Sequence, residues 1–69
     1  MSGRRLRWVP GPPSGGVVYF MRAWHNEVEF SVAKFVVDGV ERFGLWKAKV
    51  LQEIFDRRLD ALNRAEELL

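Results

Sequence analysis

Two neighbouring segments of the chain, residues 17–24 and 27–37, are rich in β-branched and aromatic side chains, and polar and apolar residues alternate from residue 27 to residue 32. A period of two built from these residue types predicts β-strands. His25 and Asn26 stand between the segments, and residues of these types tolerate the left-handed backbone of a tight turn. We therefore expect an antiparallel hairpin with these two residues as its loop.

The register of this hairpin follows from its two-residue loop and sorts the side chains by polarity. One face becomes wholly apolar through three opposed pairs: Ala23 and Val28, Met21 and Phe30, and Tyr19 and Val32. The other face is mixed, with the pairs Trp24 and Glu27, Arg22 and Glu29, and Phe20 and Ser31. Arg22 and Glu29 would attract each other across the strands. The apolar face is the one that we expect to be buried.

A second hairpin is predicted at Asp38-Gly39, because this dipeptide lies between two apolar runs and is a strong short-range hairpin signal. The third strand would then cover residues 40–43. The alternation changes phase at residues 33–35, where a β-bulge would account for the change. The alternative for residues 27–37 is a helix, but its apolar side chains would then project from opposite helical faces.

From about Leu45 to Leu69 the apolar positions follow a helical period instead. Their arc is about 180° wide, whereas one packing surface requires only about 100°. A helix of this length would extend for about 37 Å, but a strand of seven or eight residues spans only about 25 Å. We therefore expect the end of the helix to project beyond the sheet with apolar side chains exposed.

This projecting part of the helix leads us to expect self-association, which would cover it. The expected assembly is a homo-oligomer, most simply a dimer, with an interface formed by Phe55, Arg58, Leu62, Ala65, Leu68 and Leu69. Arg58 lies within the apolar arc, where it either extends its charged head to water or pairs with Glu66 or Glu67 of a second copy. The alternative is that the N-terminal arm folds back over the helix through Leu6 and Trp8.

These elements together predict an α+β fold. We expect a small antiparallel β-meander of three strands, or of four if the arm pairs with it, followed by one long amphipathic C-terminal α-helix. Residues 1–16 would form a basic arm with a Pro/Gly-rich linker or loop, and residues 17–69 the single domain. Because residues 5–9 alternate in polarity, the arm is either an edge strand or a disordered tail.

Length and composition favour one small domain of low stability. A chain of 69 residues buries only about 60% of the surface that its unfolded form exposes. With no Cys and one His, neither disulfides nor a metal site is expected to stabilise it. No apolar run approaches the roughly 18 residues of a membrane span, and the N-terminus lacks the apolar core of a secretory signal. We expect a cytoplasmic protein without a membrane partner.

Positive charge is concentrated in the N-terminal arm. Its three arginines have no acidic neighbour, whereas residues 17–69 carry eight basic and nine acidic side chains. Guanidinium groups suit phosphates, and a Trp can stack on an unpaired base. The candidate nucleic-acid contacts are Arg4, Arg5, Arg7 and Trp8. The alternative is a solvated tail whose charge aids solubility.

A three-stranded meander that ends in a helix loosely resembles the AP2 and integrase arm-binding domains, and residues 33–39 are similar to their second strand and turn. The resemblance implies that the sheet face opposite the helix would lie in the DNA major groove. The sequence departs from that pattern at Glu27 and Glu29, which would face the phosphates, and in its longer helix. We do not assign the family on this likeness.

Catalysis is not expected, because the chain has no phosphate-cradling glycine loop, metal-ligand spacing or nucleophile motif. His25 lies in a predicted turn, and Glu29 has Arg22 opposite it, so neither side chain requires a catalytic explanation. No cofactor or small-molecule substrate is inferred. The favoured function is a non-catalytic interaction module that self-associates through its C-terminal helix. The alternative is a small nucleic-acid-binding protein that uses the arm and the exposed sheet face.

Overall fold

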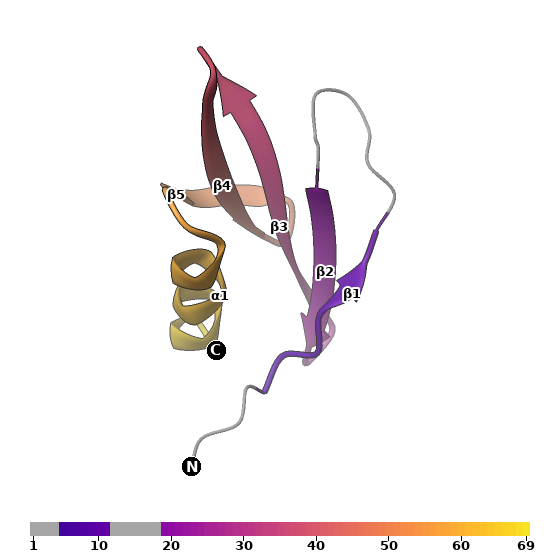
Figure 1. The fold of residues 1–69 in the computed structure, drawn as a ribbon. Helices are drawn as coiled ribbons and strands as arrows, with labels where there is room; N and C mark the ends of the chain where they lie inside the picture. The colour runs from indigo at the N-terminus through magenta and orange to yellow at the C-terminus, as the bar shows by residue number, and fades with distance from the viewer. Residues whose placement is uncertain (1–4, 12–18) are drawn as a thin grey trace.

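The computed structural model describes residues 5–11 and 19–69 of the chain. Within these ranges, an antiparallel sheet of five strands in the order β1-β2-β3-β4-β5 is followed by one helix (Figure 1). The elements are β1 Val9–Pro10, β2 Tyr19–His25, β3 Val28–Val37, β4 Val40–Lys47, β5 Val50–Phe55 and α1 Arg58–Glu67. The expected α+β class, with the sheet before a C-terminal helix, is confirmed. The expected number of strands, three or four, was too low.

Three two-residue loops connect the strands from β2 to β5, and both residues of each loop have positive φ. The loops are Asn26-Glu27, Asp38-Gly39 and Ala48-Lys49, with φ values between 51° and 77°. Loops of this geometry twist with the flanking strands and are therefore the favoured hairpin connections. The hairpin predicted at Asp38-Gly39 is confirmed.

The first hairpin turns one residue later than expected, which shifts its register by two. Ala23 lies opposite Phe30 and Met21 opposite Val32, because His25 still belongs to β2 and pairs with Val28. A shift of two residues leaves every side chain on the same face of the sheet. The predicted apolar face is therefore retained, with Ala23, Phe30 and Val32 all buried.

The predicted bulge at residues 33–35 is wrong. Pairing of β3 with both neighbouring strands is regular there, and the irregularity lies instead between Leu45 and Trp46, where β4 pairs with β5. The change of phase has another cause. Ala33 and Phe35 are on the sheet face opposite Val32, so apolar side chains simply occupy both faces of β3 at this point.

The predicted helix from Leu45 to Leu69 is also wrong in its first half. Residues 45–47 complete β4, β5 follows, and α1 begins only at Arg58. At 1.5 Å per residue, the ten residues of α1 extend for about 15 Å. No long helical overhang therefore exists in the described part of the chain, and the argument for self-association that depended on it no longer holds.

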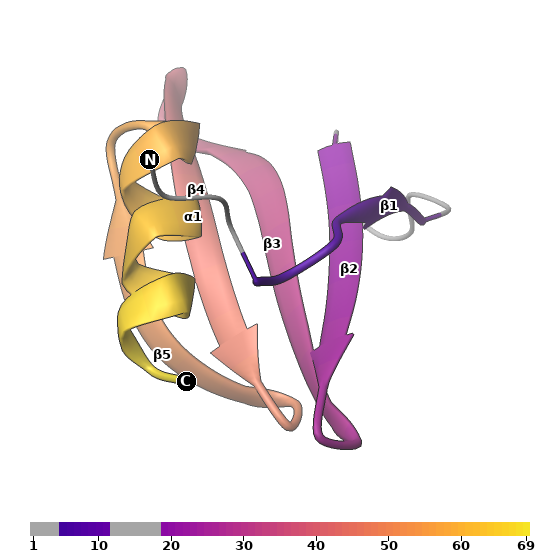
Figure 2. The same cartoon turned by 90° about the horizontal axis from the view of Figure 1, so that it is seen from below.

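The core lies between the sheet and α1, which packs over β3, β4 and β5 on one face (Figure 2). Eight buried side chains form it: Leu6, Ala23, Phe30, Val32, Leu45, Ala61, Leu62 and Ala65. Two of the residues expected at an oligomer interface, Leu62 and Ala65, are thus part of the chain's own core. Leu68 and Phe55 pack against this core while remaining partly exposed.

Residues 5–11 of the N-terminal arm belong to the folded structure. Val9 and Pro10 pair with β2 as a short edge strand, and Leu6 is 3% exposed in the core beneath α1. The backbone N–H groups of Arg5 and Leu6 donate hydrogen bonds to the carboxylate of Glu66 on α1. Leu6 and Trp8 of the arm therefore pack on the core, although the helix overhang that the alternative interpretation had them cover does not exist.

Candidate aromatic and basic binding face

The sheet face opposite α1, called the outer face below, carries an unusual number of aromatic side chains. Strand alternation places these residues there: Phe20, Arg22 and Trp24 of β2, Glu29, Ser31, Ala33, Phe35 and Val37 of β3, Val40, Arg42, Gly44 and Trp46 of β4, and Leu51 and Ile54 of β5. Trp24, Leu51 and Ile54 are each close to half exposed. In the described structure, α1 covers the other face and leaves this one open.

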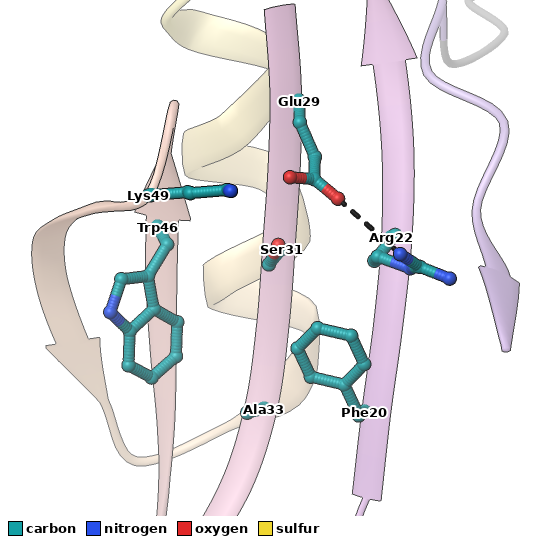
Figure 3. A pocket seen from close by; sticks show the side chains of 7 residues that line it. All are labelled: Phe20, Arg22, Glu29, Ser31, Ala33, Trp46 and Lys49. Atoms are coloured by element: carbon teal, nitrogen blue, oxygen red, sulfur yellow. Dashed lines mark ion pairs between the residues drawn. The ribbon is translucent and has the colours of Figure 1, made fainter. Parts of the chain in front are cut away.

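A hollow of about 460 Å³ lies at the centre of the outer face. Figure 3 shows Phe20 on one side and Trp46 on the other, with the small side chains of Ser31 and Ala33 on β3 between them. Three charged residues complete its lining: Arg22, Glu29 and Lys49. The volume is within the range of about 300–1,000 Å³ typical of ligand sites.

Two glycines lie so close to the aromatic rings of the hollow that a β-carbon at either position would overlap a ring. A β-carbon on Gly44 would lie only 2.6 Å from Cη2 of Trp46 and 3.2 Å from Cε1 of Phe35. A β-carbon on Gly11 would lie 2.5 Å from Cδ2 of Phe20, whose carbonyl accepts a 3.0 Å hydrogen bond from the Gly11 N–H. The two glycines therefore allow both rings to lie close to the backbone beside the hollow.

Arg22 lies between two rings of its own strand. Its guanidinium carbon is 5.9 Å from the centre of the Phe20 ring and 5.5 Å from that of the Trp24 ring, which are cation–π distances. Its Nη1 atom lies 3.7 Å from Oε2 of Glu29. The attraction predicted between Arg22 and Glu29 is thus present, although the register makes the two residues diagonal neighbours. With Lys49, the lining carries two cations and one carboxylate.

Lys49 occupies a strained position at the edge of the hollow. Its φ is 68° and that of Ala48 is 51°, a region that costs an L-residue about 1–2 kcal/mol. The Ala48 N–H donates a 2.8 Å hydrogen bond to the Glu29 carbonyl, which ties this turn to β3. Glycine would satisfy the backbone here at lower cost. Strain of this kind is concentrated at functional sites, so the presence of Lys favours a role for its side chain.

The described arm residues that were expected to contact nucleic acid do not lie at the hollow. Arg4 lies outside the described residues, and Arg5 and Arg7 are exposed. Trp8 packs against the core, and its indole Nε1 is buried without a hydrogen-bond partner, so its ring is not a free stacking surface. The described arm residues are not part of the lining of the hollow.

The expected interface residues on α1 also occupy separate places. Leu62 and Ala65 are buried, Leu68 and Leu69 are partly buried at its C-terminal end, and Arg58 is exposed in its first turn. Sequence reasoning missed the hollow because Trp46 and Lys49 had been assigned to a helix. The available signal was on β2, where Phe20, Arg22 and Trp24 alternate with the buried residues.

Other kinds of site find no support in the described residues. Across residues 5–11 and 19–69, no three His, Asp or Glu side chains are grouped so that they could hold a metal ion. No helix in these ranges is both long and apolar enough to cross a membrane. Comparisons with family models, with curated proteins and with solved structures give no match to this chain. Functional inference therefore rests on the geometry of the outer face.

Proposed function

We propose that this chain is a small non-catalytic binding module that holds single-stranded nucleic acid on its outer face. The observation that carries the proposal is the hollow, where Phe20 and Trp46 flank a floor of small side chains with Arg22 and Lys49 beside it. Unpaired bases stack on such rings with about 1–3 kcal/mol per base. Cations beside the rings attract the phosphates that connect those bases.

The charges of the hollow favour this ligand over a cationic one. Aromatic sites for ammonium groups leave ring faces open to the ligand's charge. Here the guanidinium of Arg22 already lies over Phe20 and Trp24. Two cations against the single carboxylate of Glu29 make the lining positive. A ligand that is flat and anionic satisfies both the rings and the charge.

A single strand fits the surface better than a duplex does. The rings lie on an open sheet face, and bases can reach them only when they are unstacked. Arg5 and Arg7 are exposed but do not line the hollow, and the backbone N–H of Arg5 is bound to Glu66 of α1. The phosphate contacts proposed here are therefore those of Arg22 and Lys49. Because few cations take part, binding should be weak and strongly dependent on salt.

Binding of a fluorescein-labelled, mixed-sequence single-stranded DNA, measured by anisotropy at low salt, tests the proposal. Replacing Trp46 by Leu keeps an apolar side chain but removes the ring, and should weaken binding about 5- to 150-fold, the equivalent of about 1–3 kcal/mol.

The matched charge control is Lys34→Ala, because Lys34 pairs with Glu41 at 2.9 Å and is not part of the hollow. This variant should bind within about threefold of wild type. Equal binding by wild type and Trp46→Leu, or no binding by wild type at low salt, would refute the proposal.

A further inference from the structure

β5 is one of the two edge strands of the sheet, and the other, β1, is only two residues long. Five of the six residues of β5 are exposed, including Val50 at 61%, Leu51 at 47% and Ile54 at 49%. Glu53 is its one charged residue, and the strand contains no Pro. Natural proteins usually protect an edge strand with charge, Pro or a covering element, because its unpaired backbone groups accept another strand.

The polarity of β5 is symmetric about its centre. The strand reads apolar, apolar, polar, polar, apolar, apolar from Val50 to Phe55. Leu51 pairs with Trp46 and Ile54 with Gly44, so both apolar side chains belong to the outer face although they are three residues apart. This placement is possible because Gln52 has no partner on β4, where the register shifts.

The inner face of the strand repeats the symmetry. Val50 pairs with Lys47 and Phe55 with Phe43, which places both on the side of α1. An antiparallel copy of β5 centred between Gln52 and Glu53 would therefore place apolar side chains opposite apolar side chains on both faces of the sheet. Glu53 already lies 3.6 Å from Arg64, so its charge would not repel the second copy strongly.

From this symmetry we propose that a second copy of this chain pairs antiparallel with β5. Leu51 of one copy then lies opposite Ile54 of the other on the outer face, and Val50 lies opposite Phe55 on the inner face. Such a contact is isologous, because the same surface serves both copies around a two-fold axis perpendicular to the sheet. Gln52 of each copy lies opposite Glu53 of the other, next to this axis.

The pairing has a consequence for the outer face. A two-fold axis perpendicular to the sheet keeps both outer faces on the same side, so the two hollows belong to one continuous sheet. Leu51 and Ile54 of both copies join into one apolar strip between them. A partner supplies the stabilisation that a core of this size lacks. This dimer does not depend on the nucleic-acid proposal and is tested without nucleic acid.

The first test measures molar mass by light scattering across micromolar concentrations. Wild type should reach twice the 8.0 kDa chain mass. Ile54→Lys should stay monomeric, since it places a charge opposite Leu51 of the second copy. Leu59→Lys, an equally exposed apolar residue at 55% on α1, is the matched control and should remain dimeric. A monomeric wild type, or a monomeric Leu59→Lys beside a dimeric Ile54→Lys, overturns the proposal.

A second test does not depend on a disruptive substitution. The chain has no Cys, so disulfides report only introduced residues. Directly opposed Cα atoms of antiparallel strands lie about 4.5–5.5 Å apart, within disulfide reach. Leu51→Cys combined with Ile54→Cys should form covalent dimers on mild oxidation, whereas Leu59→Cys should not. Failure of the double variant to cross-link while folded, or equal cross-linking by Leu59→Cys, contradicts pairing through β5.

Discussion

The carboxylate of Glu66 accepts a 2.8 Å hydrogen bond from the backbone N–H of Leu6, sixty positions away in the sequence. Its other oxygen accepts a 3.0 Å bond from the N–H of Arg5. This contact fixes the arm on α1 and allows Leu6 to enter the core, so one glutamate joins the two ends of the chain.

Replacing Glu66 by Ala should lower the free energy of unfolding by about 1–3 kcal/mol, because it leaves a partly buried N–H without an acceptor. Urea denaturation followed by circular dichroism measures the change. The control is Glu67→Ala, since Glu67 only pairs with Arg64 at the surface and should contribute at most about 0.5 kcal/mol. Equal stability of the two variants would mean that the arm is not held by Glu66.

Phe30 is the largest side chain in the core and is 1% exposed. Phe30→Ala should cost about 3–5 kcal/mol, which is most of the stability of a domain this small. The variant should therefore unfold near room temperature in a thermal melt. Phe20→Ala, which removes the same ring from the outer face, should cost clearly less. A Phe30→Ala protein that melts like wild type would show that the observed register is incorrect.

Lys49 should lower the free energy of unfolding while it strengthens the binding of single-stranded DNA. Lys49→Gly relieves the strain of a positive φ and should raise the free energy of unfolding by about 1 kcal/mol, while it weakens binding of single-stranded DNA. Lys49→Ala should weaken binding equally without the gain in stability. Each variant should also reduce the slope of log affinity against log salt by about 0.7, the effect of one lost phosphate contact on a single strand. Unchanged affinity in both variants would remove Lys49 from the site.

Gly44 should control the position of Trp46. Gly44→Ala adds a β-carbon that would overlap the indole, so the ring must move away from the strand. We expect a changed near-ultraviolet circular dichroism spectrum and weaker DNA binding. The far-ultraviolet spectrum should keep its strand signal because Ala is tolerated in β4. Wild-type spectra and affinity would mean that the ring adapts without consequence for the hollow.

The sequence predicted those parts of the fold that have strong local signals. Asp38-Gly39 identified its hairpin, and the two-residue period of the first hairpin's strands identified the buried face that contains Phe30. The prediction of this face was correct despite the error in the loop position, because the register shifted by two residues and each side chain kept its face. Side-chain polarity, more than turn chemistry, therefore carried the information about the core.

The third hairpin could not be predicted for a physical reason. Ala48-Lys49 lacks the Gly or Asn that normally marks a type I′ loop. Without that signal, the paired apolar residues at the two ends of β5 matched the spacing of a helical stripe. The same error assigned Trp46 of β4 and Lys49 of the following loop to a helix, so the candidate site was not found.

Amide chemical shifts of ¹⁵N-labelled protein, recorded while a short single-stranded DNA is added at low salt, test the proposed function most directly. Binding on the outer face predicts the largest shifts at the hollow, in particular at Phe20, Ser31, Trp46 and Lys49, and much smaller ones along α1. The indole N–H signal of Trp46 should move, while that of the buried Trp8 should not. Shifts confined to the arm and α1, or no shifts at all, would contradict binding at this face.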